Sequence, residues 1–331
     1  MSKIVLSHPL YKPGMDLLAR SGNEVVIPND GNSDHIIEYL RNADAFILRI
    51  GKIDAKAIEQ CSKLKVITRP GVGVDNVDVK CATKHGIPVV ICPGVNAVSV
   101  AEHTIALLFA CAKNLIESYE ETLKGNFAIR SKYCAMEVSG KVLAILGFGH
   151  IGQNVARMAF GIGMKVVVYD PFYTEEQIEK FGYQYATTID DAISIADFVT
   201  LHMPSLPETK KMVNARFLNV MKKSAFLINC ARGDIVDEEA LYMALEKHWI
   251  AGAGVDVLDT EPMDINSPLM KLSNFIVSPH MAAQTVEATT KTVTMAVEGT
   301  LAVLAGERWK NVCNPEVYET DGWKKRTTER T

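Results

Sequence analysis

The stretch VLAILGFGHIGQNVARMAFGIGMKVVVYD, residues 142–170, decides the fold expected for this chain. Its apolar start predicts a buried strand. Gly147, Gly149 and Gly152 follow in the spacing G-x-G-x-x-G, before a helical pattern and a second apolar run. In such a turn the first glycine allows the bend, the second admits a pyrophosphate, and the third allows helix and strand to pack closely. Because free N–H groups at a helix start attract phosphates, the stretch predicts a βαβ unit that binds a dinucleotide.

Asp170 ends the second apolar run, at roughly the 20-residue spacing that a ribose-binding carboxylate requires. Pro171, Phe172 and Tyr173 follow it, and no arginine stands there to meet a 2′-phosphate. These residues favour NAD over NADP as the cofactor. The alternative is an ordinary βα turn followed by a surface aspartate.

The bulk properties are those of a globular protein. At 331 residues the chain is long enough for two domains, each with a core of its own. A formal net charge of −4 gives no reason to expect nucleic acid or an anionic membrane as a partner. The apolar run 105–112 is too short to span a bilayer. Seven cysteines without a C-x-x-C pair favour a reducing, cytoplasmic location and no metal site.

Two series of alternating strands and helices are predicted. The expected strands are 4–6, 25–27, 45–48, 66–68 and 89–92, then 142–146, 166–169, 198–201, 225–229, 253–258 and 275–277. Helical patterns in the first series include 15–20, 34–41, 55–61 and 77–85. Regular alternation predicts parallel sheets covered by helices on both faces, and six strands in the second series are typical of a dinucleotide-binding domain.

Two long helices are also expected. The first covers 99–124, with Ser99 and Glu102 in the spacing of a capping box. The second covers 285–306. The charged tail from Glu319 is expected to be a solvated end.

Candidate catalytic residues follow the strands of the second series. Arg232 follows the fourth strand, Glu261 lies beyond the fifth, and His280 follows the sixth. Ligands of an open parallel sheet bind beyond the carboxyl ends of its strands, so the three share the cofactor edge. Arginine can hold a carboxylate, histidine can donate a proton near neutral pH, and glutamate can orient that histidine. Together they fit reduction of a 2-oxo acid, although each alone has an ordinary structural explanation.

Other polar residues at this edge are candidates for cofactor contacts. His202 and Pro204 follow the third strand, Cys230 follows the fourth, and Asp256 lies at the fifth. Asp256 is expected to accept a hydrogen bond from the nicotinamide carboxamide, or else to be a buried structural acid. His202 could pack near the cofactor without reacting. His103, on the first long helix, is expected to be structural.

The first series places an anion site at its own strand ends. Arg49 follows the third strand, and Gly71, Val72 and Gly73 follow the fourth. Backbone N–H groups of a Gly-x-Gly loop can hold a carboxylate, and Arg49 and Lys52 add positive charge. The alternative is a plain turn with solvated basic residues.

These residues carry a family likeness. The chain resembles the D-isomer-specific 2-hydroxyacid dehydrogenases, especially the branch of phosphoglycerate dehydrogenases and hydroxypyruvate/glyoxylate reductases. The matching segments are RPGVGVDNVD (69–78), NAVSVAEHTIALLFA (96–110), LGFGHIG (146–152), LHMPSLPET (201–209), INCARGDIVDEEAL (228–241), AGAGVDVLDTEP (251–262) and SPHMAAQT (278–285).

The resemblance implies an α/β protein with two doubly wound parallel sheets. An NAD-binding Rossmann domain, residues 99–284, would be inserted into a flavodoxin-like substrate domain formed by residues 1–98 and 285–331. Relatives are commonly dimers through the long-helix region. Arg232, Glu261 and His280 fall on the family's catalytic positions. The expected cofactor contacts are Thr104, Gly147, Gly149, His150, Ile151, Gly152, Asp170, His202, Pro204, Thr209, Cys230 and Asp256, and the expected substrate contacts are Arg49, Val72, Gly73, Arg232 and His280. His150 stands where many relatives have arginine or lysine.

We therefore expect reversible hydride transfer between NAD(H) and a small D-2-hydroxy acid. Phosphohydroxypyruvate and hydroxypyruvate rank ahead of glyoxylate and pyruvate, because Arg49 suits an additional polar group. One alternative is an NAD-sensing interaction protein of the corepressor type on the same fold. A formate dehydrogenase-like enzyme is disfavoured, because that group has glutamine where Glu261 stands.

Overall fold

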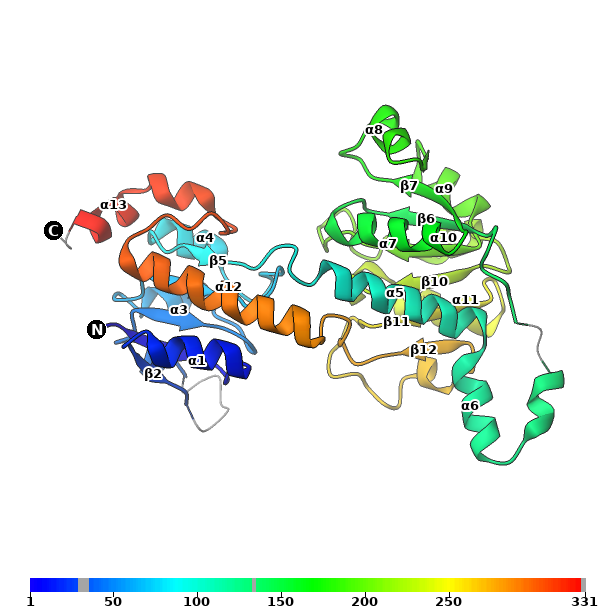
Figure 1. The fold of residues 1–331 in the computed structure, drawn as a ribbon, viewed down its shortest axis with the longest axis horizontal. Helices are drawn as coiled ribbons and strands as arrows, with labels where there is room; N and C mark the ends of the chain where they lie inside the picture. The colour runs from blue at the N-terminus through cyan, green and yellow to red at the C-terminus, as the bar shows by residue number, and fades with distance from the viewer. Residues whose placement is uncertain (29–35, 133–134, 329–331) are drawn as a thin grey trace. The chain divides into compact units, whose positions relative to one another are not determined.

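The computed structural model describes residues 1–28, 36–132 and 135–328, and separates into two compact units (Figure 1). One unit is Met1–Asn96 with Thr285–Thr331, and the other is Ala97–Gln284. Cys134 and the expected helix start at Asp34 lie outside the described residues. Both units contain a parallel sheet flanked by helices, which confirms the predicted α/β class. Among the described residues, no helix is both long and apolar enough to cross a membrane.

The first unit has a five-stranded parallel sheet in the order β2-β1-β3-β4-β5, the flavodoxin-like order. Its strands are β1 (Lys3–Leu6), β2 (Glu24–Val26), β3 (Ala45–Ile47), β4 (Val66–Thr68) and β5 (Val89–Val90). Its helices are α1 (Lys12–Arg20), α2 (Ile36–Leu40), α3 (Ala55–Glu59), α4 (Val79–Lys84), α12 (Val286–Ala305), η4 (Pro315–Glu319) and α13 (Asp321–Thr328). Alternate strand residues enter two cores, with Ile4 and Leu6 on one face of the sheet and Val5 on the other.

Helix α12 agrees closely with the expected helix 285–306. The hydroxyl of Thr285 accepts a hydrogen bond from the amide of Ala288, and Gly306 ends the helix with a φ of 91°. The tail after Glu319 differs from the expectation of a solvated end. Trp323 in α13 is only 5% exposed, and its ring packs edge to face on Tyr318, with centroids 5.0 Å apart. Trp323 therefore docks this charged segment on the core of the unit.

The second unit has a seven-stranded parallel sheet in the order β12-β11-β10-β9-β6-β7-β8. Its strands are β6 (Val142–Leu146), β7 (Lys165–Tyr169), β8 (Gln184–Tyr185), β9 (Phe198–Leu201), β10 (Phe226–Asn229), β11 (Gly252–Val255) and β12 (Phe275–Val277). The chain runs outward from β6 in both directions, so the carboxyl ends of β6 and β9 form the switch point where ligands bind. Edge strand β8 was not predicted, because two residues are too few to show a period.

Helices cover both faces of this sheet and enclose two apolar cores. The helices are α5 (Ala97–Ala112), α6 (Leu115–Leu123), η1 (Phe127–Ser131), α7 (His150–Gly161), α8 (Glu175–Lys180), α9 (Ile189–Ile195), α10 (Ala215–Val220), η2 (Gly233–Ile235), α11 (Glu238–Glu246) and η3 (Pro268–Lys271).

The expected helix 99–124 is two helices, α5 and α6, which meet at Asn114 in a left-handed conformation with a φ of 48°. The predicted capping box at Ser99 is wrong, because Ser99 is buried inside α5, which already begins at Ala97. Helix α5 packs on the sheet, whereas α6 has no buried residue and extends away from the sheet with η1 (Figure 1). Ala112 is the last buried residue of α5, and α6 begins after the left-handed turn at Asn114.

Candidate functional site

The glycine turn after β6 has the local geometry of a phosphate site. Gly147 has a φ of 98°, and a Cβ there would lie 2.7 Å from the carbonyl of His202. A Cβ at Gly152 would lie 2.1 Å from the carbonyl oxygen of Gly147. In contrast, no atom lies within 4 Å of the Cβ position of Gly149, the N-cap of α7, and no side chain caps the helix. Open space beside uncapped amides suits a pyrophosphate.

Asp170 lies at the end of β7 and is buried. One carboxylate oxygen accepts a hydrogen bond from the amide of Phe148 at 2.6 Å, and the other accepts one from the amide of Phe172 at 2.8 Å. A carboxylate has about four acceptor positions, so two remain for ribose hydroxyl groups. The carboxylate also fixes the glycine turn through Phe148. Both features fit a dinucleotide.

His202 lies at the switch point, and its amide donates to the carbonyl of Leu146 at 2.8 Å. Its Nε2 is 3.0 Å from the hydroxyl of Thr200, and its buried Nδ1 has no partner. Burial lowers the pKa of the imidazole to about 3, so the ring is neutral at physiological pH. A neutral imidazole agrees with a packing contact rather than with proton transfer.

The remaining cofactor candidates differ in burial. Burial raises the pKa of the Cys230 thiol to about 12, which removes it as a nucleophile. The buried hydroxyl of Thr104 donates to the carbonyl of Val100 within α5. The hydroxyl of Thr209 donates to the carbonyl of Pro204 and accepts from an amide of the same loop, so it shapes that loop. His150 and Ile151 form the first turn of α7 beside Gly149, where His150 is exposed.

The three catalytic candidates follow adjacent strands. Strands β10, β11 and β12 pair in parallel, with Asn229 opposite Val255 and Val255 opposite Val277. Arg232, Glu261 and His280 come after these strand ends, on the same edge of the sheet. Glu261 and His280 line one cavity, and the residues that line it do not include Arg232.

Arg232 lies in a turn held by Asn229. The buried amide side chain of Asn229 accepts a hydrogen bond from the amide of Ala231 at 2.9 Å and donates to the carbonyl of Arg232 at 2.9 Å. The guanidinium of Arg232 donates to the carbonyl of Ala231 at 2.7 Å. These bonds fix the backbone from which the guanidinium extends.

Gly233 brings the arginine turn into contact with the loop that leads to Glu261. A Cβ at Gly233 would lie 1.9 Å from the carbonyl carbon of Leu258 and 2.4 Å from the amide nitrogen of Asp259. Only a residue without a side chain can occupy such a position. Sequence reasoning did not single out Gly233, although it directly follows Arg232 in the motif.

His280 and Glu261 form a pair, with Nδ1 of the imidazole 2.7 Å from Oε2 of the carboxylate. Oε1 of Glu261 accepts a hydrogen bond from the amide of Leu258 at 3.2 Å. The pair lines a cavity of about 400 Å³, together with Asp256, Pro262 and Ser278. A carboxylate on Nδ1 leaves Nε2 of the ring to face a ligand.

Asp256 is 1% exposed, and its carboxylate holds the loop that carries His280. Oδ1 accepts hydrogen bonds from the hydroxyl of Ser278 at 2.5 Å and from the amide of Met281 at 2.9 Å, and Oδ2 accepts from the amide of Ala282 at 2.8 Å. Of its two expected roles, these bonds favour the buried structural acid. One acceptor position on Oδ2 remains for a ligand.

The substrate candidates of the first unit lie at the ends of β3 and β4. Arg49 stacks on Tyr11 at 4.8 Å and donates to the carbonyl of Pro9, and Val72 is exposed beside Gly73. Arg69 was missed by the sequence reasoning. Its guanidinium lies 3.7 Å from the Cβ position of Gly71, so it adds positive charge to the same loop.

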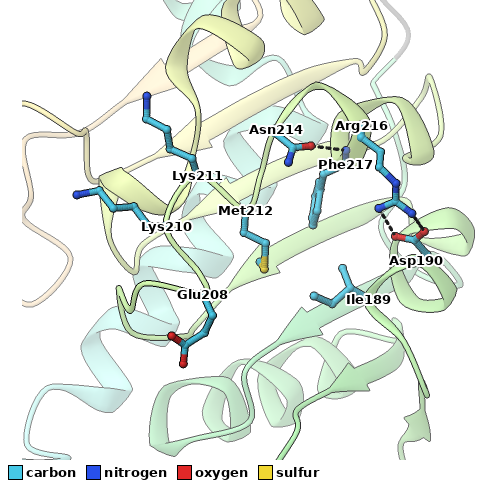
Figure 2. Close-up of a pocket in the computed structure, with 9 residues that line it drawn as sticks. All are labelled: Ile189, Asp190, Glu208, Lys210, Lys211, Met212, Asn214, Arg216 and Phe217. Carbon is cyan, nitrogen blue, oxygen red and sulfur yellow. Dashed lines mark hydrogen bonds and ion pairs between the residues drawn. The ribbon is translucent and has the colours of Figure 1, made fainter.

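A second cavity, of about 380 Å³, lies in the second unit between α9 and α10 (Figure 2). Its Arg216 forms a two-bond ion pair with Asp190, while Lys210 and Lys211 point away from that pair (Figure 2). None of the described residues that line this cavity belongs to the predicted site. We therefore assign the candidate site to the cavity that contains His280.

Comparison with known proteins identifies the family. Residues 105–282 match the family model described as D-isomer specific 2-hydroxyacid dehydrogenase, NAD binding domain. The chain is 38% identical to the glyoxylate reductase of Korarchaeum cryptofilum, over 86% of both chains. It is also 38% identical to the D-3-phosphoglycerate dehydrogenase of Methanocaldococcus jannaschii, over 95% of this chain and 60% of that protein. The chain spans about half to three fifths of the phosphoglycerate dehydrogenases that it matches.

Two solved structures extend the likeness to the whole fold. The TT0316 protein from Thermus thermophilus has a TM-score of 0.83 and 32% identity, over 94% of this chain and 99% of that one. The acyclic imino acid reductase Bsp5, solved with NADPH and D-Arg, has a TM-score of 0.83 and 30% identity, also over 94% and 99%. The chain belongs to the D-isomer specific 2-hydroxyacid dehydrogenase family.

Proposed function

We propose that this protein is an NAD-dependent oxidoreductase that transfers a hydride reversibly between NAD(H) and a small D-2-hydroxy acid. The observation that carries the proposal is the hydrogen-bonded pair of His280 and Glu261, which lies on the same sheet edge as Arg232. The glycine turn of the same unit has the open, uncapped geometry that a dinucleotide needs. Family membership supports the same reaction class.

The residues present fit a bound NAD. Amide groups at the start of α7 would hold the pyrophosphate in the open space beside Gly149, and Asp170 would accept the ribose hydroxyl groups. When bound, the nicotinamide ring supplies or accepts the hydride. The similar imino acid reductase was solved with NADPH, so family membership does not decide between NAD and NADP. The proposed preference of this chain for NAD therefore depends on Asp170.

His280 is proposed to move the proton. Because Nδ1 donates to Glu261, Nε2 is the atom that faces the substrate, and the carboxylate stabilises the protonated ring. On reduction, Nε2–H donates its proton to the carbonyl oxygen as negative charge develops there; on oxidation, Nε2 accepts it. Arg232 would bind the substrate carboxylate and polarise the carbonyl.

The substrate is proposed to be a small anionic 2-oxo acid, with phosphohydroxypyruvate and hydroxypyruvate ahead of glyoxylate and pyruvate. Arg49, Arg69 and the backbone of Val72 and Gly73 provide the positive and N–H groups that an additional phosphate or hydroxyl would contact. Two relatives, named D-3-phosphoglycerate dehydrogenase and glyoxylate reductase, support the substrate class, and the order within it rests on Arg49.

The active form is proposed to be a homodimer. Helix α6 and the start of η1 expose Leu115, Ile116, Tyr119, Leu123 and Phe127, and the last two are 71% and 72% exposed. An exposed apolar patch of this kind marks an interaction surface, and a second copy of the chain would cover it. Light scattering after size exclusion should give twice the chain mass, and Leu123→Glu should lower that mass towards one chain.

Unpaired cysteines in the described residues support the proposed cytoplasmic location.

A panel of four 2-oxo acids tests the reaction directly. Loss of nicotinamide absorbance, measured with phosphohydroxypyruvate, hydroxypyruvate, glyoxylate and pyruvate, should give the highest kcat/KM for one of the first two. Replacing NADH by NADPH should lower kcat/KM, because Asp170 repels a 2′-phosphate. Tight binding of NADH without turnover of any acid would contradict the proposal.

A further inference from the structure

A second histidine, His103 in α5, is hydrogen-bonded to the loop that carries His280. We propose that His103 is a positioning residue for the reaction proposed above: through Ser278 and Asp256 it holds His280 in the conformation that meets Glu261. The inference rests on the proposed function for its consequence on turnover. It rests on the hydrogen bonds of the described residues for its geometry.

The contact runs through three side chains from three separate elements. Nε2 of His103 lies 2.8 Å from the hydroxyl of Ser278, and that hydroxyl lies 2.5 Å from Oδ1 of Asp256. Nε2 of His103 is itself 3.5 Å from the same carboxylate oxygen. A carboxylate only accepts, so the Ser278 hydroxyl donates to Asp256 and must accept from Nε2–H of His103. The direction of each hydrogen bond, and the tautomer of His103, follow from this order.

The same carboxylate holds the backbone on the far side of His280. Oδ1 and Oδ2 of Asp256 accept from the amides of Met281 and Ala282, and the backbone carbonyl of Asp256 accepts from the amide of His280 at 2.8 Å. Residues before, at and after His280 are therefore all tied to Asp256. Because the carboxylate is almost fully buried, each donor that it loses leaves a charge less well satisfied.

His280 needs this support because its backbone conformation is unfavourable. Its φ is 51°, in the left-handed region that residues with a Cβ rarely occupy. Such a conformation persists only where the surroundings impose it. Here it directs the imidazole to Glu261, with Nδ1 2.7 Å from Oε2. Loss of the His103 bond would leave the Ser278 oxygen without its donor, weaken the hold on the loop and let the ring of His280 leave its productive direction.

This role predicts a particular kinetic signature. The glycine turn and Asp170 belong to other elements, β6, α7 and β7, and Ser278 contacts Oδ1 of Asp256 rather than the acceptor position left on Oδ2, so binding of NADH should be little affected. The chemical step should slow, because a small misplacement of a catalytic group is costly. We therefore expect His103→Phe to lower kcat by about 10- to 100-fold, with KM for NADH nearly unchanged.

The test compares His103→Phe with His103→Gln, Ser278→Ala and the control His248→Asn. Glutamine can place an N–H near the position of Nε2, so it should restore most of kcat, whereas Ser278→Ala should resemble the phenylalanine variant. His248 is exposed and lies before β11, at the amino ends of the strands and away from the site. Its φ of 51° is one that asparagine adopts readily. The control should keep the wild-type kcat.

A second readout does not depend on turnover. In protein labelled at the histidine ring carbons, the NMR signal of His280 should shift in His103→Phe and return towards its wild-type position in His103→Gln. Wild-type kcat and an unshifted His280 signal in folded His103→Phe would overturn the proposal. Equal losses in the phenylalanine and glutamine variants would also overturn it. If the wild type turns over no acid, the proposed function fails, and the His280 signal alone then decides whether His103 positions the loop.

Discussion

Gly233→Ala should disable the site without disrupting the fold. The backbone of Gly233 is not in the left-handed region, so alanine meets no conformational strain there. Its Cβ, however, would lie 1.9 Å from the carbonyl carbon of Leu258 and 2.1 Å from the oxygen. Restoring an ordinary contact needs the two loops to separate by roughly 1.5 Å. Those loops carry Arg232 on one side and Glu261 on the other.

The expected cost is larger for activity than for stability. Overpacking of this kind lowers the free energy of unfolding by about 1–3 kcal/mol. A misplacement of about 1 Å at a catalytic group lowers turnover by about 100-fold, so kcat/KM for hydroxypyruvate should fall by at least that factor. Binding of NADH should change little, because the glycine turn lies on other strands.

The assay pairs turnover with two controls. NADH consumption gives kcat/KM, quenching of NADH fluorescence gives the affinity for NADH, and urea unfolding followed by circular dichroism gives stability. Gly161→Ala is the matched control, because no atom lies within 4 Å of its Cβ position and it ends a helix. That variant should keep wild-type kcat/KM. Wild-type kcat/KM in Gly233→Ala would refute the inferred contact between the two loops.

Three further substitutions test the proton donor, the pyrophosphate site and the docking of α13. His280→Gln should lower kcat by about 10²- to 10⁴-fold, measured as NADH consumption; retained turnover would remove His280 from the mechanism. Gly149→Ala should fold normally but weaken NADH binding by about 10-fold, or ~1.4 kcal/mol, because its methyl group occupies the pyrophosphate space; unchanged affinity in a fluorescence titration would be inconsistent with that site. Trp323→Ala should lower the free energy of unfolding by about 3–5 kcal/mol in urea, whereas exposed Val286→Ala should not; equal stability of the two would show that α13 does not dock.

Most of the fold could be predicted from the sequence, because buried parallel strands appear in it as short apolar runs. Strands such as β6 and β9 are buried on both faces, so short runs of mostly apolar residues mark them. Strand β8 could not be found this way, since it has two residues and one is exposed. The break at Asn114 was missed because the residue types on both sides favour helix. The break is seen only in the structure, as the left-handed backbone of Asn114 and the absence of buried residues in α6.

The site likewise has some residues that could be predicted from the sequence and others that could not. Placement of Arg232, Glu261 and His280 on one edge follows from strand polarity, which the βα alternation already fixes. The roles of Ser278 and His103 could not be predicted from the sequence, because the two residues that form this hydrogen bond lie 175 positions apart. Asp256 was ambiguous for a related reason. Its two explanations differ only in which donors surround the carboxylate, and only the folded loop shows that Ser278, Met281 and Ala282 provide them.

The configuration of the reduced product shows whether the site transfers a hydride to give a D-2-hydroxy acid. With NADH and hydroxypyruvate, we expect one D-glycerate formed for each NADH consumed, resolved by chiral chromatography. Formation of L-glycerate, or NADH bound without any glycerate formed, would show that the proposed reaction is wrong.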